Sequence, residues 1–169
     1  MDEEQKKAAH LELAGQAREE ALDAFRAWLE GHRLSAPPVE PLALDFGLGD
    51  FRRVGLIECW IANEKAAGYC GKQLFVFDGQ RCPLHRHRAK HETFFVVAGE
   101  VDMDYDGQTR LMRPGDVLAV EPWKYHSFVG VGDALLLELS TPCEVADNDF
   151  HDPRIHKEPP ALASMRKEG

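Results

Sequence analysis

Two histidines separated by one residue, with a glutamate shortly after them, constrain this chain more than any other feature. His85 and His87 are followed five residues later by Glu92, and His126 comes at the end of a later apolar run. Residues two apart in a β-strand point to the same face, so His85 and His87 present their imidazoles side by side, and Glu92 is expected to enter from the next strand. Imidazole and carboxylate ligands suit Zn, Mn, Fe, Ni or Cu far better than Ca or Mg. The spacing therefore predicts a barrel built around one metal ion.

Composition narrows the class of protein further. The chain has 169 residues, 44% of them hydrophobic and 29% charged, which indicates one packed domain with an appendage. Its net charge of -9 argues against binding to nucleic acid or to an anionic membrane surface. It has no apolar run long enough to cross a bilayer, and its acidic start does not resemble a secretory signal.

The four cysteines form no CxxC pair, so we interpret them as reduced thiols of a cytoplasmic protein. Cys82 lies close to the histidine pair. It is an odd number of residues from both His85 and His87, so regular strand alternation places it on the opposite face.

The pattern along the chain predicts an N-terminal helix, a β-rich body and a polar tail. Apolar residues spaced three and four apart predict one helix over residues 2–31, ending near Gly31 and followed by a proline-rich linker. The predicted domains are the helix at 1–35, the barrel at 36–146 and a surface tail at 147–169. Short β-rich runs separated by Gly, Pro and Asp turns predict an antiparallel sandwich or small barrel, with strands at Val54–Ala62, Gln73–Phe77, Thr93–Tyr105, Val117–Val120, Ser127–Val131 and Ala134–Leu139.

Two spaced motifs resemble those of the cupin superfamily. The first consists of Gly79, His85, His87, Glu92 and Gly99, and the second of Gly115, Pro122 and His126. Pro122 stands one position later than is usual, and Trp123-Lys124-Tyr125 replaces a glycine-containing turn, but neither departure removes a metal ligand. The resemblance implies an all-β fold, the double-stranded β-helix or jelly-roll barrel, in which His85, His87, Glu92 and His126 bind one divalent metal. The alternatives are a structural histidine cluster and a cupin that has lost its metal.

A narrower resemblance covers roughly residues 42–155. The segments Tyr69-Cys70-Gly71-Lys72, Gly79-Gln80-Arg81-Cys82-Pro83-Leu84-His85, Lys90-His91-Glu92-Thr93-Phe94 and Asp152-Pro153-Arg154-Ile155 are similar to the cupin-type D-lyxose isomerase family. This resemblance implies interconversion of D-lyxose and D-xylulose with Mn²⁺, although Zn, Fe, Co or Ni also fit the ligands. Here the shortest usual link joins Gly99 to Gly115, where family members carry an insertion.

Aldose–ketose isomerisation through an enediol requires a group that moves a proton between adjacent carbons and a group that serves the oxygens. Glu138 interrupts an apolar run, where a carboxylate is costly unless it is paired or used, so we assign it as the base. Lys90 shares strand parity with Glu92 and is assigned as the acid or oxygen stabiliser. A solvated basic run for Lys90 and a rim salt bridge for Glu138 remain alternatives. The predicted substrate-binding residues are Lys72, on the strength of the family resemblance, and the apolar walls Phe94, Trp123 and Tyr125.

Two other functions fit the same ligands. One is an Fe(II)-dependent cupin dioxygenase, and the other is a cupin that binds a sugar at its metal without turnover. The sugar-isomerase hypothesis rests on the local resemblance and on Lys90 and Glu138. By analogy with cupins in general, we also expect a homodimer that pairs through edge strands or the N-terminal helix.

Overall fold

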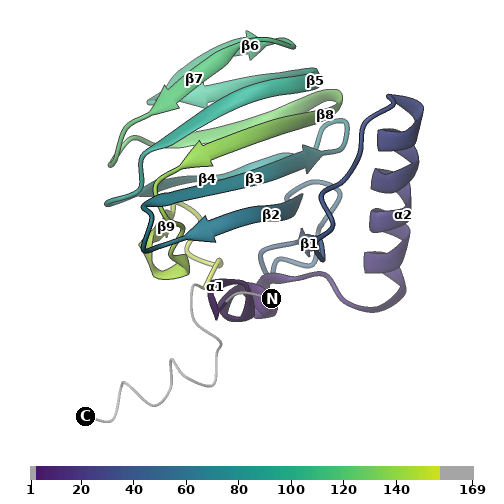
Figure 1. Cartoon of the computed structure of the whole chain (residues 1–169), viewed down its shortest axis with the longest axis horizontal. Helices are drawn as coiled ribbons and strands as arrows, with labels where there is room; N and C mark the ends of the chain where they lie inside the picture. Colours follow the sequence, from purple (N-terminus) through teal and green to yellow (C-terminus); the bar gives the residue numbers. More distant parts are fainter. Residues whose placement is uncertain (1–2, 157–169) are drawn as a thin grey trace.

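Nine antiparallel strands curl into a barrel in the computed structural model of the protein, which describes residues 3–156 (Figure 1). The sheet order is β1-β2-β3-β8-β4-β9, and β5 pairs with β6, β7 and β8. The elements are α1 Glu3–Ala8, the 3-10 turn η1 Ala9–Leu11, α2 Gly15–Gly31, β1 Leu42–Leu44, β2 Leu56–Glu64, β3 Tyr69–Val76, β4 Arg81–His87, β5 Glu92–Tyr105, β6 Gln108–Met112, β7 Val117–Val120, β8 His126–Ser140, the 3-10 turn η2 Val145–Asp147 and β9 Asn148–Phe150.

The barrel closes because two long strands bend together. β5 and β8 pair along almost their whole length, and the register shifts around Ala98, between Val96 and Glu100. Gly99 has φ +76° at this bend, and a Cβ there would lie 2.2 Å from the Asp133 carbonyl oxygen, so only glycine fits. Both strands thereby pass from one wall of the barrel to the other, which confirms the predicted jelly-roll barrel.

The predicted single helix over residues 2–31 is wrong in its first half. It is broken into α1, η1 and α2, because Glu12 forms a bridge to Leu44 and the Leu13 N–H donates to the Ala43 carbonyl. Pairing with β1 therefore replaces helical hydrogen bonds at this point. α2 ends at Gly31 as predicted and packs its apolar stripe on the outer face of the sheet, with Phe25 tilted against Phe75 at 5.0 Å between ring centroids.

Strand prediction succeeded for the long runs and for β7, but it missed three other short strands. The two runs predicted at Ser127–Val131 and Ala134–Leu139 are one strand, β8, because Gly132 bends it without ending its pairing with β5. β1, β6 and β9, of three to five residues each, were not predicted, although the equally short β7 was predicted at Val117–Val120.

The chain returns to the barrel just after residue 147, where the predicted surface tail begins. β9 pairs with β4 at the mouth of the barrel, where His87 lies opposite Asn148 and His85 opposite Phe150. The part of the predicted tail from residue 157 onward lies outside the described residues. Over residues 3–156, none of the helices is both long and apolar enough to span a membrane.

Candidate metal centre and active site

The three predicted histidines meet inside the barrel mouth. β4 supplies His85 and His87, and β8 begins at His126, which is the Cα partner of His85. One ligand atom from each histidine lies within 4.8 Å of the other two, so the three form a cluster capable of holding a metal ion.

Glu92 begins β5 next to this cluster. Its Oε1 lies 3.2 Å from His87 Nε2, and its Oε2 lies 2.9 Å from His126 Nε2. Nevertheless His87 Nε2, His126 Nε2 and Glu92 Oε2 are buried without a hydrogen-bond partner among the described residues. The ligands of one metal ion are typically buried polar atoms that lie close together without hydrogen bonding to one another, because each points at the ion. The residues therefore fit a divalent metal.

Backbone carbonyl oxygens next to the cluster fix which nitrogen of two of these imidazoles carries the proton. His85 Nδ1 lies 2.8 Å from the Pro83 carbonyl oxygen, and His126 Nδ1 lies 3.1 Å from that of Lys124. A carbonyl only accepts, so each Nδ1 carries the proton and each Nε2 keeps a lone pair for a metal. Burial, followed by the neighbouring imidazoles, lowers the pKa of His85 well below its usual value, and burial also lowers the pKa of His87. His85 and His87 are thus held neutral, which suits them to bind a cation.

Two lysines and three glutamates form an ion-pair network beside the histidines, and all of them except the partly exposed Glu58 are buried. Lys90 Nζ donates to Glu92 Oε1 at 2.7 Å and to Glu138 Oε1 at 2.5 Å. Lys72 Nζ lies 3.8 Å from Glu138 Oε2 and 3.4 Å from Glu58 Oε2. Lys90 is therefore not part of a solvated basic run, and Glu138 does not form a rim salt bridge, since both are buried.

The charges of this network are fixed by its pairing. Burial would raise the pKa of Glu138, but the Lys72 and Lys90 ammonium groups outweigh it and hold the pKa below its usual value. Burial likewise opposes charge on Lys90, yet Glu138 and Glu92 raise its pKa. Burial opposes charge on Glu92 as well, but Lys90 and His87 keep its pKa well below the usual range. At neutral pH Glu138 is therefore a carboxylate and Lys90 an ammonium group.

Sheet register explains why residues far apart in sequence meet here. Lys72 on β3 is the Cα partner of Trp60 on β2 and of Glu138 on β8, and Glu138 is the partner of Phe94 on β5. Cross-strand partners share a face, so this row points into the barrel. The first cavity is lined by Leu56, Glu58, Lys72, Leu74, Cys82, His85, His87, Lys90, Glu92, Phe94, Phe128, Glu138 and Asn148.

Most but not all of the predicted site residues reach this cavity. Lys72 and Phe94 line it, as do Lys90 and Glu138. Trp123 is 53% exposed and, with Tyr125, flanks the Arg86 guanidinium instead. The structure therefore does not bring Trp123 and Tyr125 to the cavity as walls for a sugar.

The prediction for Cys82 is also corrected. Cys82 lines the same cavity as His85, because the pairing of β4 with β8 shifts register between these two residues and the alternation of faces breaks. Cys82 nevertheless lies outside the histidine cluster, and burial raises the pKa of its thiol well above the usual value. His91 faces outward toward Glu121, as strand parity predicts.

Sequence reasoning missed Glu58, Trp60 and Asn148. Trp60 Nε1 donates to Glu58 Oε2 at 2.7 Å, and Lys72 Nζ stands 4.3 Å from the centroid of the Trp60 ring. Glu58 interrupts an apolar run just as Glu138 does, so the signal that identified Glu138 was available for it. Asn148 carried no such signal, because only the unpredicted strand β9 brings it to the cavity.

The curled antiparallel barrel with three inward histidines defines a cupin, and residues 76–140 match the Cupin domain family. The chain is 31% identical to the D-lyxose/D-mannose isomerase of Thermosediminibacter oceani, with 68% of this chain and 78% of the relative covered. The chain belongs to the family of cupin-type D-lyxose isomerases and is a sugar isomerase.

Two other proteins are similar to this chain, one in its fold and one over only part of its length. The solved structure of an Acinetobacter sp. DL28 L-ribose isomerase mutant, E204Q, with L-ribose has a TM-score of 0.71 at 15% identity, covering 88% of this chain and 96% of the other, which shows the shared fold. A 5-nitrosalicylic acid 1,2-dioxygenase of Bradyrhizobium sp. is 27% identical, but only 53% of this chain and 38% of that enzyme are covered.

Proposed function

We propose that the protein is a metal-dependent aldose–ketose isomerase that acts on a small sugar such as D-lyxose or D-xylulose through an enediol intermediate. The observation that carries this proposal is the buried Lys90–Glu138 pair, 2.5 Å apart, directly beside the histidine cluster. A proton-accepting carboxylate and a fixed cation at one cavity wall are what the transfer of a proton between adjacent carbons requires.

In this proposal His85, His87, Glu92 and His126 hold one divalent metal. Their unpartnered buried atoms support the assignment, and Mn²⁺ is the ion that the family resemblance favours. When bound, the metal would supply Lewis-acid polarisation of the sugar oxygens.

Glu138 is proposed as the base. Its carboxylate is ionised at neutral pH, so it can accept the proton from C2 of the aldose and return it to C1. The hydroxyl proton moves from O2 to O1 in the same isomerisation, which leaves the atoms balanced. Lys90 holds its proton firmly, because its pKa is raised, so we assign it to stabilising the developing oxygen charge rather than to donating a proton.

The charge of the cavity indicates an unphosphorylated sugar. Its lining contains two ammonium groups, Lys72 and Lys90, and three carboxylates, Glu58, Glu92 and Glu138. Both lysines are already paired with carboxylates, so neither is available to neutralise a phosphate dianion. Lys72 is proposed to bind a sugar hydroxyl, and Phe94 to contact the carbon face of the sugar.

The test is an isomerase assay on purified protein whose metal content has been measured. With Mn²⁺ bound, D-lyxose is expected to yield D-xylulose, with exchange of the C2 proton in D₂O. Lack of conversion of any pentose or hexose with the site occupied would overturn the proposal. Iron-dependent oxygen consumption would indicate a dioxygenase instead, and sugar binding without turnover would indicate a binding protein.

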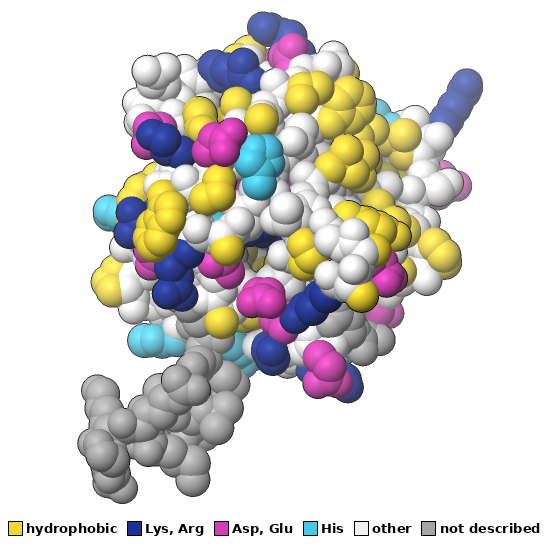
Figure 2. Space-filling model, turned by 60° about the vertical axis from the view of Figure 1, so that its left-hand side comes forward, with side chains coloured by type: hydrophobic (Ala, Val, Ile, Leu, Met, Phe, Trp, Pro, Cys, Tyr) yellow, Lys and Arg dark blue, Asp and Glu magenta, His cyan; other side chains and the backbone are white. Residues whose placement is uncertain are grey.

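We also propose that two copies of the chain pair through the outer face of the sheet that α2 leaves open. Two neighbouring cross-strand rows there carry no charge: Gly71, Leu139, Thr93 and Ala119, and Gln73, Leu137, Phe95 and Val117. Apolar side chains gather at the upper right of Figure 2, where this face comes into view. The chain carries a net charge of -9, so an uncharged face is where two identical copies meet without repulsion.

A further inference from the structure

A second cavity adjoins the one that holds the histidines. The two share the wall formed by Leu56, Glu58, Lys72, Cys82, His85 and Asn148. Beyond this wall lies what we call the distal chamber, bounded by Ala8, Leu11, Leu44, Phe46, Trp60, Cys143 and Phe150. A molecule that reacts at Lys90 and Glu138 therefore has space for its far end.

The two ends of this space differ in chemistry. Every charged, imidazole or amide side chain of the second cavity, namely Glu58, Lys72, His85 and Asn148, stands in the shared wall. The side chains that close the far end, Ala8, Leu11, Leu44, Phe46 and Phe150 among them, are apolar. The Trp60 indole N–H already donates to Glu58, so it offers no free donor to a ligand. A hydroxyl group placed at the far end would lose its hydrogen bonds to water without replacement.

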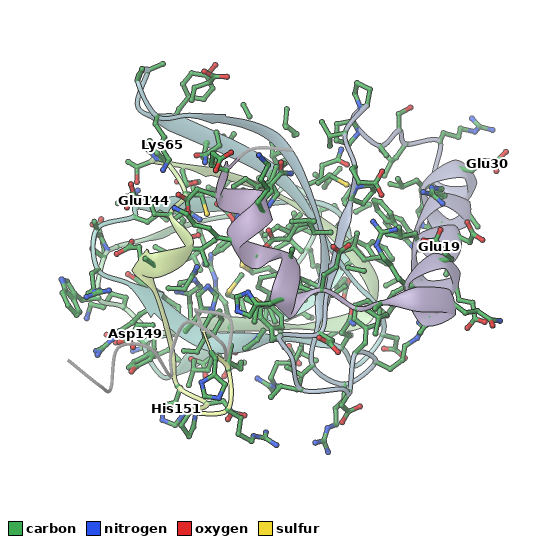
Figure 3. The ribbon with its side chains drawn as sticks, turned by 90° about the horizontal axis from the view of Figure 1, so that it is seen from below. Glu19, Glu30, Lys65, Glu144, Asp149 and His151 are labelled. Carbon is green, nitrogen blue, oxygen red and sulfur yellow. The ribbon has the colours of Figure 1, made fainter. Side chains whose placement is uncertain are left out.

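Hydrogen bonds hold the segments that close the far end of the distal chamber. Leu11 accepts hydrogen bonds at its carbonyl from the backbone N–H groups of Asp45 and Phe46, both at 3.0 Å. The Val145 N–H donates to Glu4 Oε2 at 2.9 Å, which fastens α1 to η2. Seen from below in Figure 3, α1 lies across the end of the barrel beside η2, near the labelled Lys65 and Glu144. These contacts fix the wall of the apolar end in place.

We propose that the distal chamber receives the methyl end of the substrate, so that the preferred hexose-length substrates are unphosphorylated 6-deoxy sugars. This inference rests on the proposed isomerase function, because it places C1 and C2 at Lys90 and Glu138. The hydroxyls of the middle carbons then meet Glu58, Lys72 and Asn148 in the shared wall, and C6 lies among Leu11, Phe46 and Phe150. A methyl group fits that surface, whereas a C6 hydroxyl does not.

Binding is measured first with sugar alcohols, which cannot isomerise. Calorimetry on the metal-loaded full chain compares 6-deoxy-D-mannitol with D-mannitol, which differ only in the C6 hydroxyl. We expect the deoxy compound to bind about tenfold tighter or more. Apolar pockets discriminate on this scale between ligands that differ by one hydroxyl group. The same ratio is expected in kcat/KM for 6-deoxy-D-mannose against D-mannose. Equal affinities, or tighter binding of D-mannitol, would overturn the inference.

Two variants test whether the preference for the deoxy compound arises in the distal chamber. Cys143→Ser and Leu11→Asn place polar groups in the distal chamber and are expected to reduce the preference for the deoxy compound severalfold. Leu13→Asn is the matched control, because Leu13 belongs to the same segment but packs toward α2. A preference unchanged by both chamber variants would contradict the assignment. Turnover of D-lyxose separates the two claims: an enzyme active on D-lyxose without the C6 preference refutes only the chamber, and no isomerase activity refutes the proposed function.

Discussion

Glu138 occupies the position on which the proposed proton transfer depends. Lys90 and Ser140 both donate to its Oε1, at 2.5 and 2.9 Å, so the carboxylate is held in one orientation beside the histidines. Glu138→Gln keeps the size of the side chain and removes the basic oxygen. We expect kcat to fall by roughly 10²–10⁴-fold, the range for loss of a general base, in steady-state assays.

Glu58→Gln is the matched control for this variant. Glu58 lies in the same cavity on the far side of Lys72 and has no proposed part in proton transfer, so its change is expected to act mainly on KM. If Glu58→Gln abolished kcat while Glu138→Gln left it intact, the roles of the two glutamates would be reversed.

Lys72 lies between the buried Glu138 and the partly buried Glu58, and its removal is predicted to destabilise the fold. In Lys72→Met, Glu58 and Glu138 would face each other without the cation between them. Breaking a buried pair costs about 3–5 kcal/mol in the free energy of unfolding, which urea titration measures. The double variant Lys72→Met/Glu58→Gln should recover part of that loss. Equal instability of the single and double variants would show that the charges are not coupled.

At the scale of single residues, strand parity and spacing predicted which side chains point inward but not how deeply they are buried. His85, His87, Glu92 and His126 converge as their spacing indicated. Sequence could not decide between solvated and buried states for Lys90 and Glu138, because their partners come from other strands. Parity failed at Cys82, where a register shift that the sequence does not signal turns the side chain inward.

At the scale of elements, α1 is attached to the barrel by a charged anchor. Burial would raise the pKa of Glu4, but hydrogen bonds from Lys7, the Val145 N–H and Lys65 outweigh it and lower the pKa from 4.5 to about 2. A carboxylate whose folded pKa is depressed stabilises the fold above its unfolded pKa and loses that effect as the pH falls through the folded value.

The stability that Glu4 provides should therefore depend on pH. Glu4→Gln is expected to lower the free energy of unfolding by roughly 2 kcal/mol at pH 7, and the difference from the unchanged protein should shrink as the pH falls from 4.5 toward 2. Urea titrations across this range measure it, with Glu3→Gln as the exposed control. A difference that is constant with pH would mean that the carboxylate charge is not the source.

Long elements with a clear period were predictable, whereas elements whose formation depends on a distant partner strand were not. β5 and α2 carry enough residues for their apolar pattern to be read. β9 is three residues long and exists because β4 offers it an edge, which no local pattern encodes. The break between α1 and α2 likewise depends on β1, a contact more than thirty residues away in the chain.

At the scale of the whole molecule, a bound metal should stabilise the barrel, because its ligands come from β4, β5 and β8. Chelation is expected to lower Tm and added Mn²⁺ to restore it, with about 2.7 kcal/mol gained at a hundredfold excess over Kd. His126→Ala should abolish this response and His91→Ala should keep it, since His91 faces outward. A Tm insensitive to Mn²⁺ and chelator in the unchanged protein would contradict a metal site here.

The uncharged sheet face predicts the oligomeric state. Phe95→Arg places a charge in its centre and should convert a dimer to a monomer in sedimentation velocity experiments. Val131→Arg, at an exposed apolar position outside this face, should remain dimeric. A monomeric unchanged protein, or a Phe95→Arg variant that stays dimeric, would place the interface elsewhere or remove it.

The central claim is that Glu138 moves a carbon-bound proton of a sugar next to a metal held by the histidine cluster. The most direct measurement is NMR of D-lyxose incubated in D₂O with Mn²⁺-loaded protein and with its Glu138→Gln variant, after metal removal from the quenched mixture. We expect D-xylulose and loss of the C2 proton signal with the unchanged protein, and neither with the variant at equal metal content. Equal conversion by both proteins, or by neither with the site fully occupied, would contradict it.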